Sequence, residues 1–212
     1  MKSVNPELKS YIEKNIFPEY DKNEPGHGIV HIKYVIDRSL KFAKSLDVDI
    51  DMVYTIAAFH DIGDHIDYKN HEKVSAEILK EDQNLRKFFS EEQIKTMADA
   101  VYDHRSTMKE LPRTIYGKII SQAERETNYE MAFVRTYTYR KEHNIGDTLD
   151  HIIEESRQHL LDRFGPDGQA REKVFFDDPA LEKFFTDITN CANNKEKFRQ
   201  EFLRVNNINP EG

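Results

Sequence analysis

An imidazole and a carboxylate that are neighbours in the chain, His60 and Asp61, are the residues best suited to do chemistry. They follow a strongly apolar run, residues 56–59, and Gly63 comes just after them, where a left-handed residue past a helix end is expected. An ionisable pair at the buried end of a helix must be hydrogen-bonded, paired or bound to a ligand, because an unpaired buried charge costs several kcal/mol. Imidazole nitrogen and carboxylate oxygen are both good ligands for divalent transition metals. The pair therefore indicates a metal site, with an ion pair at a helix C-terminus as the alternative.

Further histidines and a glutamate lie at the predicted ends of other helices, namely His31, His71, His104 and Glu124. Their spacing is too long for a local metal-binding finger. Because the ends of neighbouring antiparallel helices converge in a bundle, and bundle cores are common metal sites, we expect a site assembled by tertiary packing. Taken singly, each of these residues also permits a plainer interpretation as a helix-terminal or exposed side chain.

The elements that must position these side chains are helices, because apolar residues recur with helical rather than alternating periodicity. Asp47 and Asp49 are candidate N-caps for the helix that leads to His60, and Ser90 with Gln93 forms a capping-box pattern. We predict an all-α protein with helices at about 7–17, 30–44, 50–60, 71–79, 91–104, 114–126, 128–142, 147–164, 178–191 and 194–205. The later helices are predicted to be packing elements, with the aromatic residues of 129–139 and 175–185 in a core or an interface.

The composition argues against several classes of partner. A formal net charge of −8 and a pI near 5.6 disfavour binding to a nucleic-acid polymer. The single Cys191 cannot close an internal disulfide, which favours a reducing compartment. There is no signal-type stretch at the N-terminus and no run of about 18 apolar residues, so we expect a cytoplasmic protein that does not enter a membrane. Homo-oligomer formation is left open.

Five segments of the chain resemble the HD superfamily of metal-dependent phosphohydrolases, a helical fold named for its His-Asp pair. In chain order they are residues 28–35, 57–63, 71–79, 101–105 and 121–125. The resemblance implies an HD-domain-like helical bundle, with one all-α domain over 1–212, an HD core at about 25–126 and a helical extension at about 127–206, similar to that of small bacterial members. The fifth segment departs from the family, because Glu124 stands where members usually have Asp before Arg. Glutamate is one methylene longer and can still supply an oxygen ligand.

The resemblance also implies which residues hold metal. The implied ligands are His31, His60, Asp61 and Glu124. His71 and His104 would hold a second metal, as in binuclear branches of the family, or contact substrate phosphate, as in mononuclear branches. The implied cofactor is one or two divalent ions per chain, of Mn, Fe, Mg, Zn, Ni or Co.

The implied reaction is hydrolysis of a phosphomonoester, phosphodiester or pyrophosphate bond in a small, nucleotide-like substrate, through a metal-activated water that attacks phosphorus. Asp61 would be essential, and Glu72 or Asp64 would accept the proton of the attacking water. Cationic groups for the developing charge would come from Lys33, Lys69, Lys73 and Arg105, whereas Arg125 would be structural.

Two other functions stay open at this point. The departure at Glu124 suits a catalytically weak HD domain that binds a nucleotide as a sensor or scaffold. A few relatives of the fold carry out oxidative chemistry on non-phosphate substrates, which is the third hypothesis. The remaining histidines are interpreted as surface residues: His27, His65, His143, His151 and His159.

Overall fold

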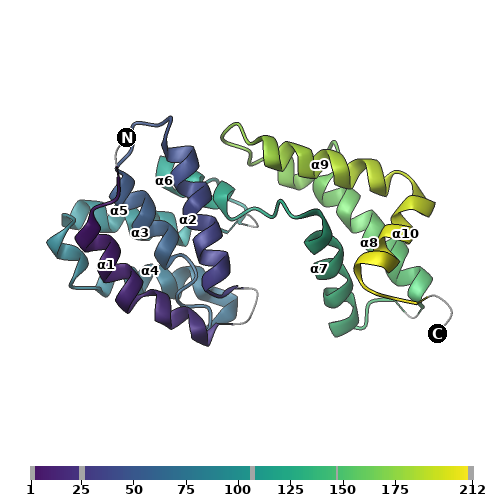
Figure 1. Cartoon of the computed structure of the whole chain (residues 1–212), viewed down its shortest axis with the longest axis horizontal. Helices are drawn as coiled ribbons and strands as arrows, with labels where there is room; N and C mark the ends of the chain where they lie inside the picture. Colours follow the sequence, from purple (N-terminus) through teal and green to yellow (C-terminus); the bar gives the residue numbers. More distant parts are fainter. Residues whose placement is uncertain (1–2, 24–26, 106–107, 147, 210–212) are drawn as a thin grey trace. The chain divides into compact units, whose positions relative to one another are not determined.

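The chain is helical wherever its structure is described. The computed structural model describes residues 3–23, 27–105, 108–146 and 148–209, and within these ranges it contains ten α-helices, short 3₁₀ turns and no strand. The predicted all-α class is therefore confirmed. Contacts divide the chain into two compact units, residues 1–124 and 125–212 (Figure 1). That the whole chain is one domain stays a prediction.

The first unit is built from six of these α-helices. They are α1 (Pro6–Asn15), α2 (Ile29–Ala43), α3 (Ile50–Phe59), α4 (His71–Glu81), α5 (Glu91–Tyr102) and α6 (Ile115–Ala123). The 3₁₀ turns in this unit are Phe17–Lys22, Tyr68–Asn70 and Leu85–Lys87. All six α-helices coincide with predicted segments to within a few residues.

Helix α3 lies at the centre of this unit. Every residue from Met52 to Phe59 is buried, and α3 packs against α1, α2, α5 and α6 (Figure 1). Its N-terminus is capped by Asp49, one of the two predicted caps, whose side chain accepts hydrogen bonds from the amides of Asp51 and Met52. Because neighbouring helices surround α3, any polar group at its C-terminal end is enclosed by them.

Two further helices of this unit begin at side-chain caps. The predicted capping box is present, since the Ser90 and Gln93 side chains each bond to the backbone of the other residue. The Thr114 hydroxyl accepts from the Gly117 amide and starts α6, which ends at Ala123 rather than at the predicted residue 126. Glu124 is therefore the C-cap residue of α6, directly after its last helical residue.

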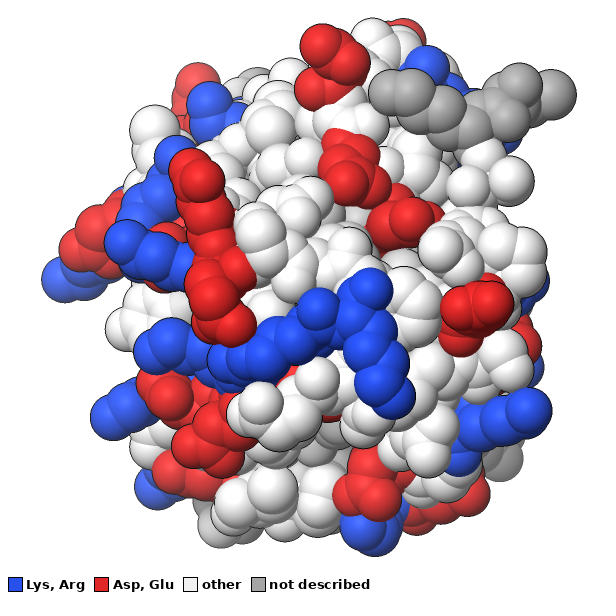
Figure 2. Space-filling model, turned by 90° about the vertical axis from the view of Figure 1, so that its left-hand side faces the viewer, with Lys and Arg blue, Asp and Glu red and all other residues white. Residues whose placement is uncertain are grey.

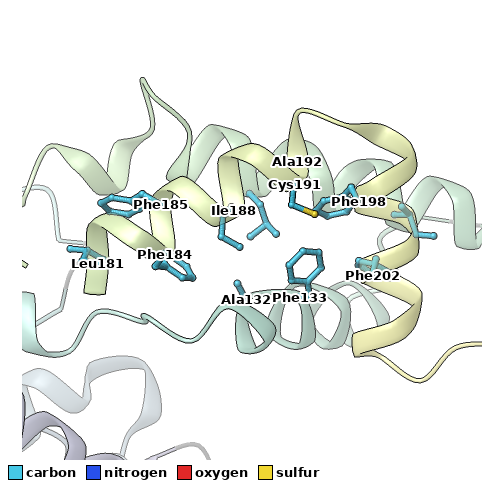
Figure 3. Close-up of a cluster of buried hydrophobic side chains, with 12 residues drawn as sticks. Ala132, Phe133, Leu181, Phe184, Phe185, Ile188, Cys191, Ala192, Phe198 and Phe202 are labelled. Carbon is cyan, nitrogen blue, oxygen red and sulfur yellow. The ribbon is translucent and has the colours of Figure 1, made fainter. Parts of the chain in front are cut away.

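The hydrophobic core of the second unit is rich in phenylalanine side chains. Its helices are α7 (Tyr129–Glu142), α8 (Leu149–Phe164), α9 (Pro179–Ala192) and α10 (Lys195–Val205), with a 3₁₀ turn at Gln169–Arg171. Figure 3 shows their shared core, to which α7, α9 and α10 contribute buried rings: Phe133, Phe184, Phe185, Phe198 and Phe202. The predicted core position is confirmed for Phe133, Phe184 and Phe185, whereas Tyr139, which belongs to the same predicted set, is exposed.

The surface carries charges of both signs. On the face drawn in Figure 2, a short band of Lys and Arg lies between groups of Asp and Glu. None of the helices, over the residues that the structure describes, is both long enough and apolar enough to cross a membrane.

Candidate metal centre

The C-terminal end of α3 places the His60 and Asp61 side chains inside the first unit. His60 is fully buried and Asp61 is 1% exposed. The chain then turns tightly, and Gly63 lies against α4. A Cβ atom on Gly63 would meet Val74 Cγ1 at 2.7 Å and the Ser75 amide nitrogen at 2.9 Å. The expected left-handed role of Gly63 is therefore wrong, because close packing on α4 explains this glycine.

A first group of possible ligand atoms comes from three separate parts of the chain. It consists of His31 of α2, His60 and Asp61 after α3, and Glu124 at the end of α6, each offering one ligand atom within 4.8 Å of the others. Glu124 Oε2 is 3.1 Å from Nε2 of both His31 and His60. Asp61 Oδ2 is 3.3 Å from His60 Nε2 and 3.7 Å from His31 Nε2. The longer glutamate side chain thus reaches both imidazoles.

A second group shares Asp61 with the first. His71, the first residue of α4, and His104, just after α5, place their Nε2 atoms 3.3 and 3.2 Å from Asp61 Oδ1. These two Nε2 atoms are 3.2 Å from each other. The two oxygens of Asp61 therefore face different sets of histidines, Oδ2 the first group and Oδ1 the second.

The backbone fixes the tautomer of three of these histidines. The Nδ1 atoms of His60, His71 and His104 lie 2.9, 2.9 and 2.6 Å from backbone carbonyl oxygens, each belonging to the residue three positions earlier. Because a carbonyl oxygen can only accept, each Nδ1 must carry a hydrogen. In the neutral rings Nε2 then holds the lone pair, and it faces the cluster. This arrangement prepares imidazoles for metal ligation.

The electrostatics follow from packing histidines against carboxylates in a buried space. Burial alone would lower the pKa of His60, but the negative charges of Asp61 and Glu124 outweigh it and hold that pKa well above its usual range. Burial would likewise raise the pKa of Glu124, but the hydrogen bond from His31 and the nearby His60 keep it well below its usual range. For His71, burial is the main influence and lowers the pKa. The cluster thus holds deprotonated carboxylates that attract either protons or a cation.

Comparison with known proteins identifies the framework around this cluster. Residues 28–129 match the model of the HD domain family. These residues form an HD domain. The predicted resemblance is therefore confirmed, and the match includes His31, His60 and Asp61 with Glu124 near its end.

Two individual proteins are similar to this chain. An uncharacterized protein of Clostridium beijerinckii is 32% identical over 106 residues, which cover 47% of this chain and 66% of that protein, just under two thirds of its length. A crystal structure of a predicted HD superfamily hydrolase from an uncultured Thermotogales bacterium is similar with a TM-score of 0.50 and 18% identity, over 93% of this chain and 88% of that chain. The second similarity concerns the fold, which the two chains share.

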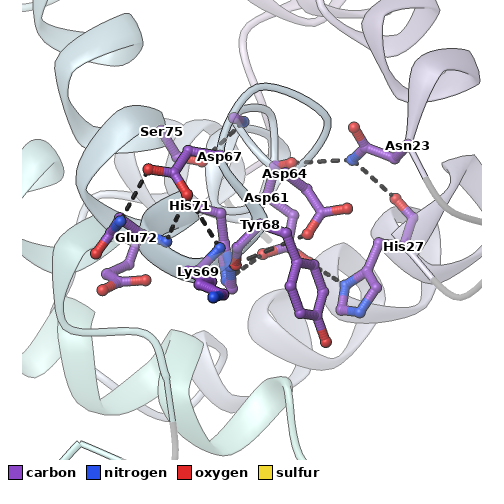
Figure 4. A network of polar contacts seen from close by, with 12 residues as sticks. Asn23, His27, Asp61, Asp64, Asp67, Tyr68, Lys69, His71, Glu72 and Ser75 are labelled. Atoms are coloured by element: carbon purple, nitrogen blue, oxygen red, sulfur yellow. Dashed lines mark hydrogen bonds and ion pairs between the residues drawn. The ribbon is translucent and has the colours of Figure 1, made fainter. Parts of the chain in front are cut away.

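The other predicted site residues of the HD domain differ in burial and in their contacts with the histidine cluster. Arg105 pairs with Glu72 at 3.1 Å and also donates to the Lys69 carbonyl oxygen at 3.1 Å. Asp64 is buried, with Oδ1 4.0 Å from His71 Nδ1, and Figure 4 shows it beside Asp61. Lys73 is exposed. Asp64 therefore lies on the Nδ1 side of the His71 ring and outside both groups of possible ligand atoms, whereas the carboxylate of Glu72 pairs with an arginine.

The two remaining lysines and Arg125 complete the predicted set. Lys33 and Lys69 are exposed, and in the part of the chain that the structure describes neither side chain makes an ion pair with the cluster. Arg125 belongs to the second unit and donates to the backbone carbonyl oxygens of Ala170 and Lys173. These backbone contacts agree with the structural role expected for Arg125.

The sequence interpretation missed one histidine of the HD domain. His27 was expected on the surface, but its side chain is only 28% exposed and its Nδ1 lies 2.9 Å from Asp61 Oδ2. This hydrogen bond raises the pKa of His27 against the lowering effect of burial. His27 precedes Gly28, the extended N-cap of α2, so helical periodicity does not connect it with His31, and its contact with Asp61 comes from tertiary packing. His65, His143, His151 and His159 are exposed, as expected.

Proposed function

We propose that this HD domain is a metal-dependent phosphohydrolase that acts on a phosphomonoester, phosphodiester or pyrophosphate bond of a small, nucleotide-like substrate. The observation that carries the proposal is the division of the Asp61 carboxylate between two groups of histidine Nε2 atoms. A carboxylate with both oxygens facing imidazole lone pairs is suited to bridge two cations.

The residues present fit a divalent cation at both positions. His60 Nε2 is buried and faces two carboxylate oxygens, Glu124 Oε2 at 3.1 Å and Asp61 Oδ2 at 3.3 Å. The Nε2 atoms of His71 and His104 would oppose two lone pairs at 3.2 Å unless a proton or a cation lies near them. Nitrogen and carboxylate ligands without cysteine suit Mn, Fe, Co, Ni or Zn, and we propose up to two ions per chain. Bound there, a divalent cation supplies Lewis acidity to a water and to the phosphate oxygens.

The protein's own groups then have distinct tasks. Asp64, buried beside Asp61, is the proposed acceptor of the proton of the attacking water. Arg105, held by Glu72 next to the start of α4, is the proposed contact for phosphate charge, with Lys69 and Lys73 as exposed cations of the same segment. Because Glu72 is paired with Arg105, we assign it to positioning that arginine.

The position of Glu124 supports an active enzyme over a nucleotide sensor. A glutamate that failed to replace aspartate would point away from the ligand group, whereas Glu124 Oε2 lies 3.1 Å from both His31 and His60. The change in length is accommodated because α6 ends at Ala123 and leaves Glu124 at the helix terminus.

The test combines metal analysis with turnover. The protein is purified without chelator or metal-affinity resin, analysed for transition metals and screened against nucleotides and other phosphate esters. Asp61→Asn keeps the shape of the side chain but removes the shared charge, so we expect metal content to fall at both positions and turnover to drop about a thousandfold or more, since several kcal/mol of charge stabilisation are lost.

The matched control is Asp37→Asn, an exposed carboxylate on α2. It should keep the parent metal content and turnover. Glu124→Gln should lose metal from the first group alone. A parent protein that takes up no manganese, iron or zinc, or an Asp61→Asn variant with parent turnover, would contradict the proposal.

A further inference from the structure

His27 forms a hydrogen bond with the Asp61 oxygen that faces the first group of possible ligand atoms. His27 Nδ1 lies 2.9 Å from Asp61 Oδ2, the oxygen that faces His31 and His60. The terminal torsion of an aspartate is broad and roughly two-fold, so the carboxylate plane is not set by the chain itself. A donor at one oxygen removes this freedom and distinguishes Oδ2 from Oδ1.

His27 is itself held in place by a side-chain amide. The Asn23 Nδ2 donates to two backbone carbonyl oxygens, that of His27 at 3.1 Å and that of Asp61 at 3.0 Å. The Asn23 Oδ1 accepts from the backbone amide of His65 at 3.2 Å. One amide therefore ties the backbone that carries His27 to the backbone that carries Asp61, as Figure 4 shows.

The ring of His27 is also supported from the side. The ring of Tyr68 lies edge-on to it, with 6.4 Å between ring centroids and an angle of 81° between the planes. His27 is nevertheless outside both groups of possible ligand atoms. Its ring lies beside the rings of two proposed ligands, with 5.6 Å between centroids to His31 and 6.4 Å to His71, and its Nδ1 is directed to Asp61.

We propose that His27, held by Asn23, is a positioning residue that fixes the Asp61 carboxylate so that its two oxygens stay divided between the two ligand groups. The inference rests on the proposed metal-dependent function. It assigns His27 a hydrogen bond that orients a ligand, and such bonds are worth about 10- to 100-fold in metal affinity.

The atom that His27 uses gives the test its design. Asparagine places an amide nitrogen near the position of Nδ1, whereas glutamine places one near the position of Nε2, and alanine places none. His27→Asn should therefore keep the hydrogen bond to Asp61, but His27→Gln and His27→Ala should lose it. A direct metal ligand or substrate contact through Nε2 would give the opposite ranking of the asparagine and glutamine variants.

The measurement is calorimetric titration of Mn²⁺ into chelator-treated protein, with the melting temperature of each metal-free variant to show that it folds. We expect His27→Ala and His27→Gln to bind Mn²⁺ about 10- to 100-fold more weakly than the parent, and His27→Asn to stay within a few-fold of it. Asn23→Asp, which turns an oxygen towards two carbonyl oxygens, should weaken binding in the same direction. His151→Asn, at an exposed histidine of α8, is the control and should match the parent.

The outcomes separate the two proposals. A parent that binds no Mn²⁺ overturns the proposed function and this inference together. A parent that binds, with a His27→Ala variant of equal affinity and stoichiometry, overturns the inference alone. Rescue by glutamine and not by asparagine also overturns it, because His27 would then act through Nε2.

Discussion

The two units of the chain use their buried space in opposite ways. In the first unit, the end of α3 is surrounded by buried ionisable side chains, among them His60, Asp61, His71 and His104. In the second unit, the main cluster around α9 consists of apolar side chains and the thiol of Cys191. Buried ionisable groups are expensive unless they are paired or bound to a ligand, so a fold retains them where they act. The contrast places the possible metal ligands in the first unit, while the buried charged residues of the second unit, Arg125, Arg140 and Asp178, bond to backbone groups.

The largest effect on stability is expected from a substitution in the aromatic core of the second unit, and it should leave metal binding unchanged. Phe133→Ala removes a fully buried ring that contacts Phe198 and Phe202, and should lower the free energy of unfolding by about 3–5 kcal/mol. Mn²⁺ affinity below the melting temperature should be unchanged. Chemical denaturation and metal titration measure the two quantities.

The matched control on the same helix is Tyr139→Ala, because that ring is 53% exposed. It should change stability by less than about 0.5 kcal/mol. If Phe133→Ala abolished metal binding under native conditions, the separation of packing from function would fail.

An intermediate effect is expected from pH in the metal-free protein. The pKa of His60 is raised above its ordinary value of 6.5, so its stabilisation is complete below that pH and is lost as the pH rises through the folded-state value. The pKa of Glu124 is lowered, so its stabilisation is present above the ordinary value of 4.5 and is lost as the pH falls. The metal-free protein should therefore become less stable above about pH 6.5.

Added metal should reverse the alkaline loss, because a cation replaces the proton on the histidines and binds better as they deprotonate. Thermal melts between about pH 5.5 and 8.5, in chelator and in Mn²⁺, check this, with the larger metal-induced rise in melting temperature expected at the alkaline end. An equal rise at all pH values would argue against the histidine cluster as the binding site.

The smallest effect is expected from charge pairs on the second unit. Hydrogen bonds from Arg157 are the main reason that the pKa of Glu154 falls to about 2, and Lys195 adds to the effect. The Glu154 side chain is 46% exposed, so solvent screening reduces its worth, and Glu154→Gln should cost less than about 1 kcal/mol near neutral pH. The difference between parent and variant should shrink as the pH falls below the ordinary carboxyl value of 4.5, since the lowered pKa stabilises only the ionised form. Urea denaturation at pH 7 and pH 3 tests this, and a loss above about 2 kcal/mol would show that surface charge matters here as much as packing.

The HD domain was indicated by resemblance to a known family, whereas the sequence by itself determined the helices and their caps at Asp49 and Ser90. These features depend on local periodicity and on side chains that bond to nearby backbone, so neighbouring residues are enough to specify them. The order of His31, His60 and Asp61 along the chain was also sufficient to indicate a metal site.

Only the tertiary structure determined which of those residues contact one another and through which atoms. The contacts of His104 with Asp61, of Glu124 with His60 and of His27 with Asp61 each join residues that are more than thirty positions apart in the chain. Gly63 gives the same lesson, since it is required by the approach of α4 and not by its own backbone angles. Such contacts depend on how several helices pack against one another. The residues of one segment do not specify that packing, because it depends on the surfaces of all the helices involved.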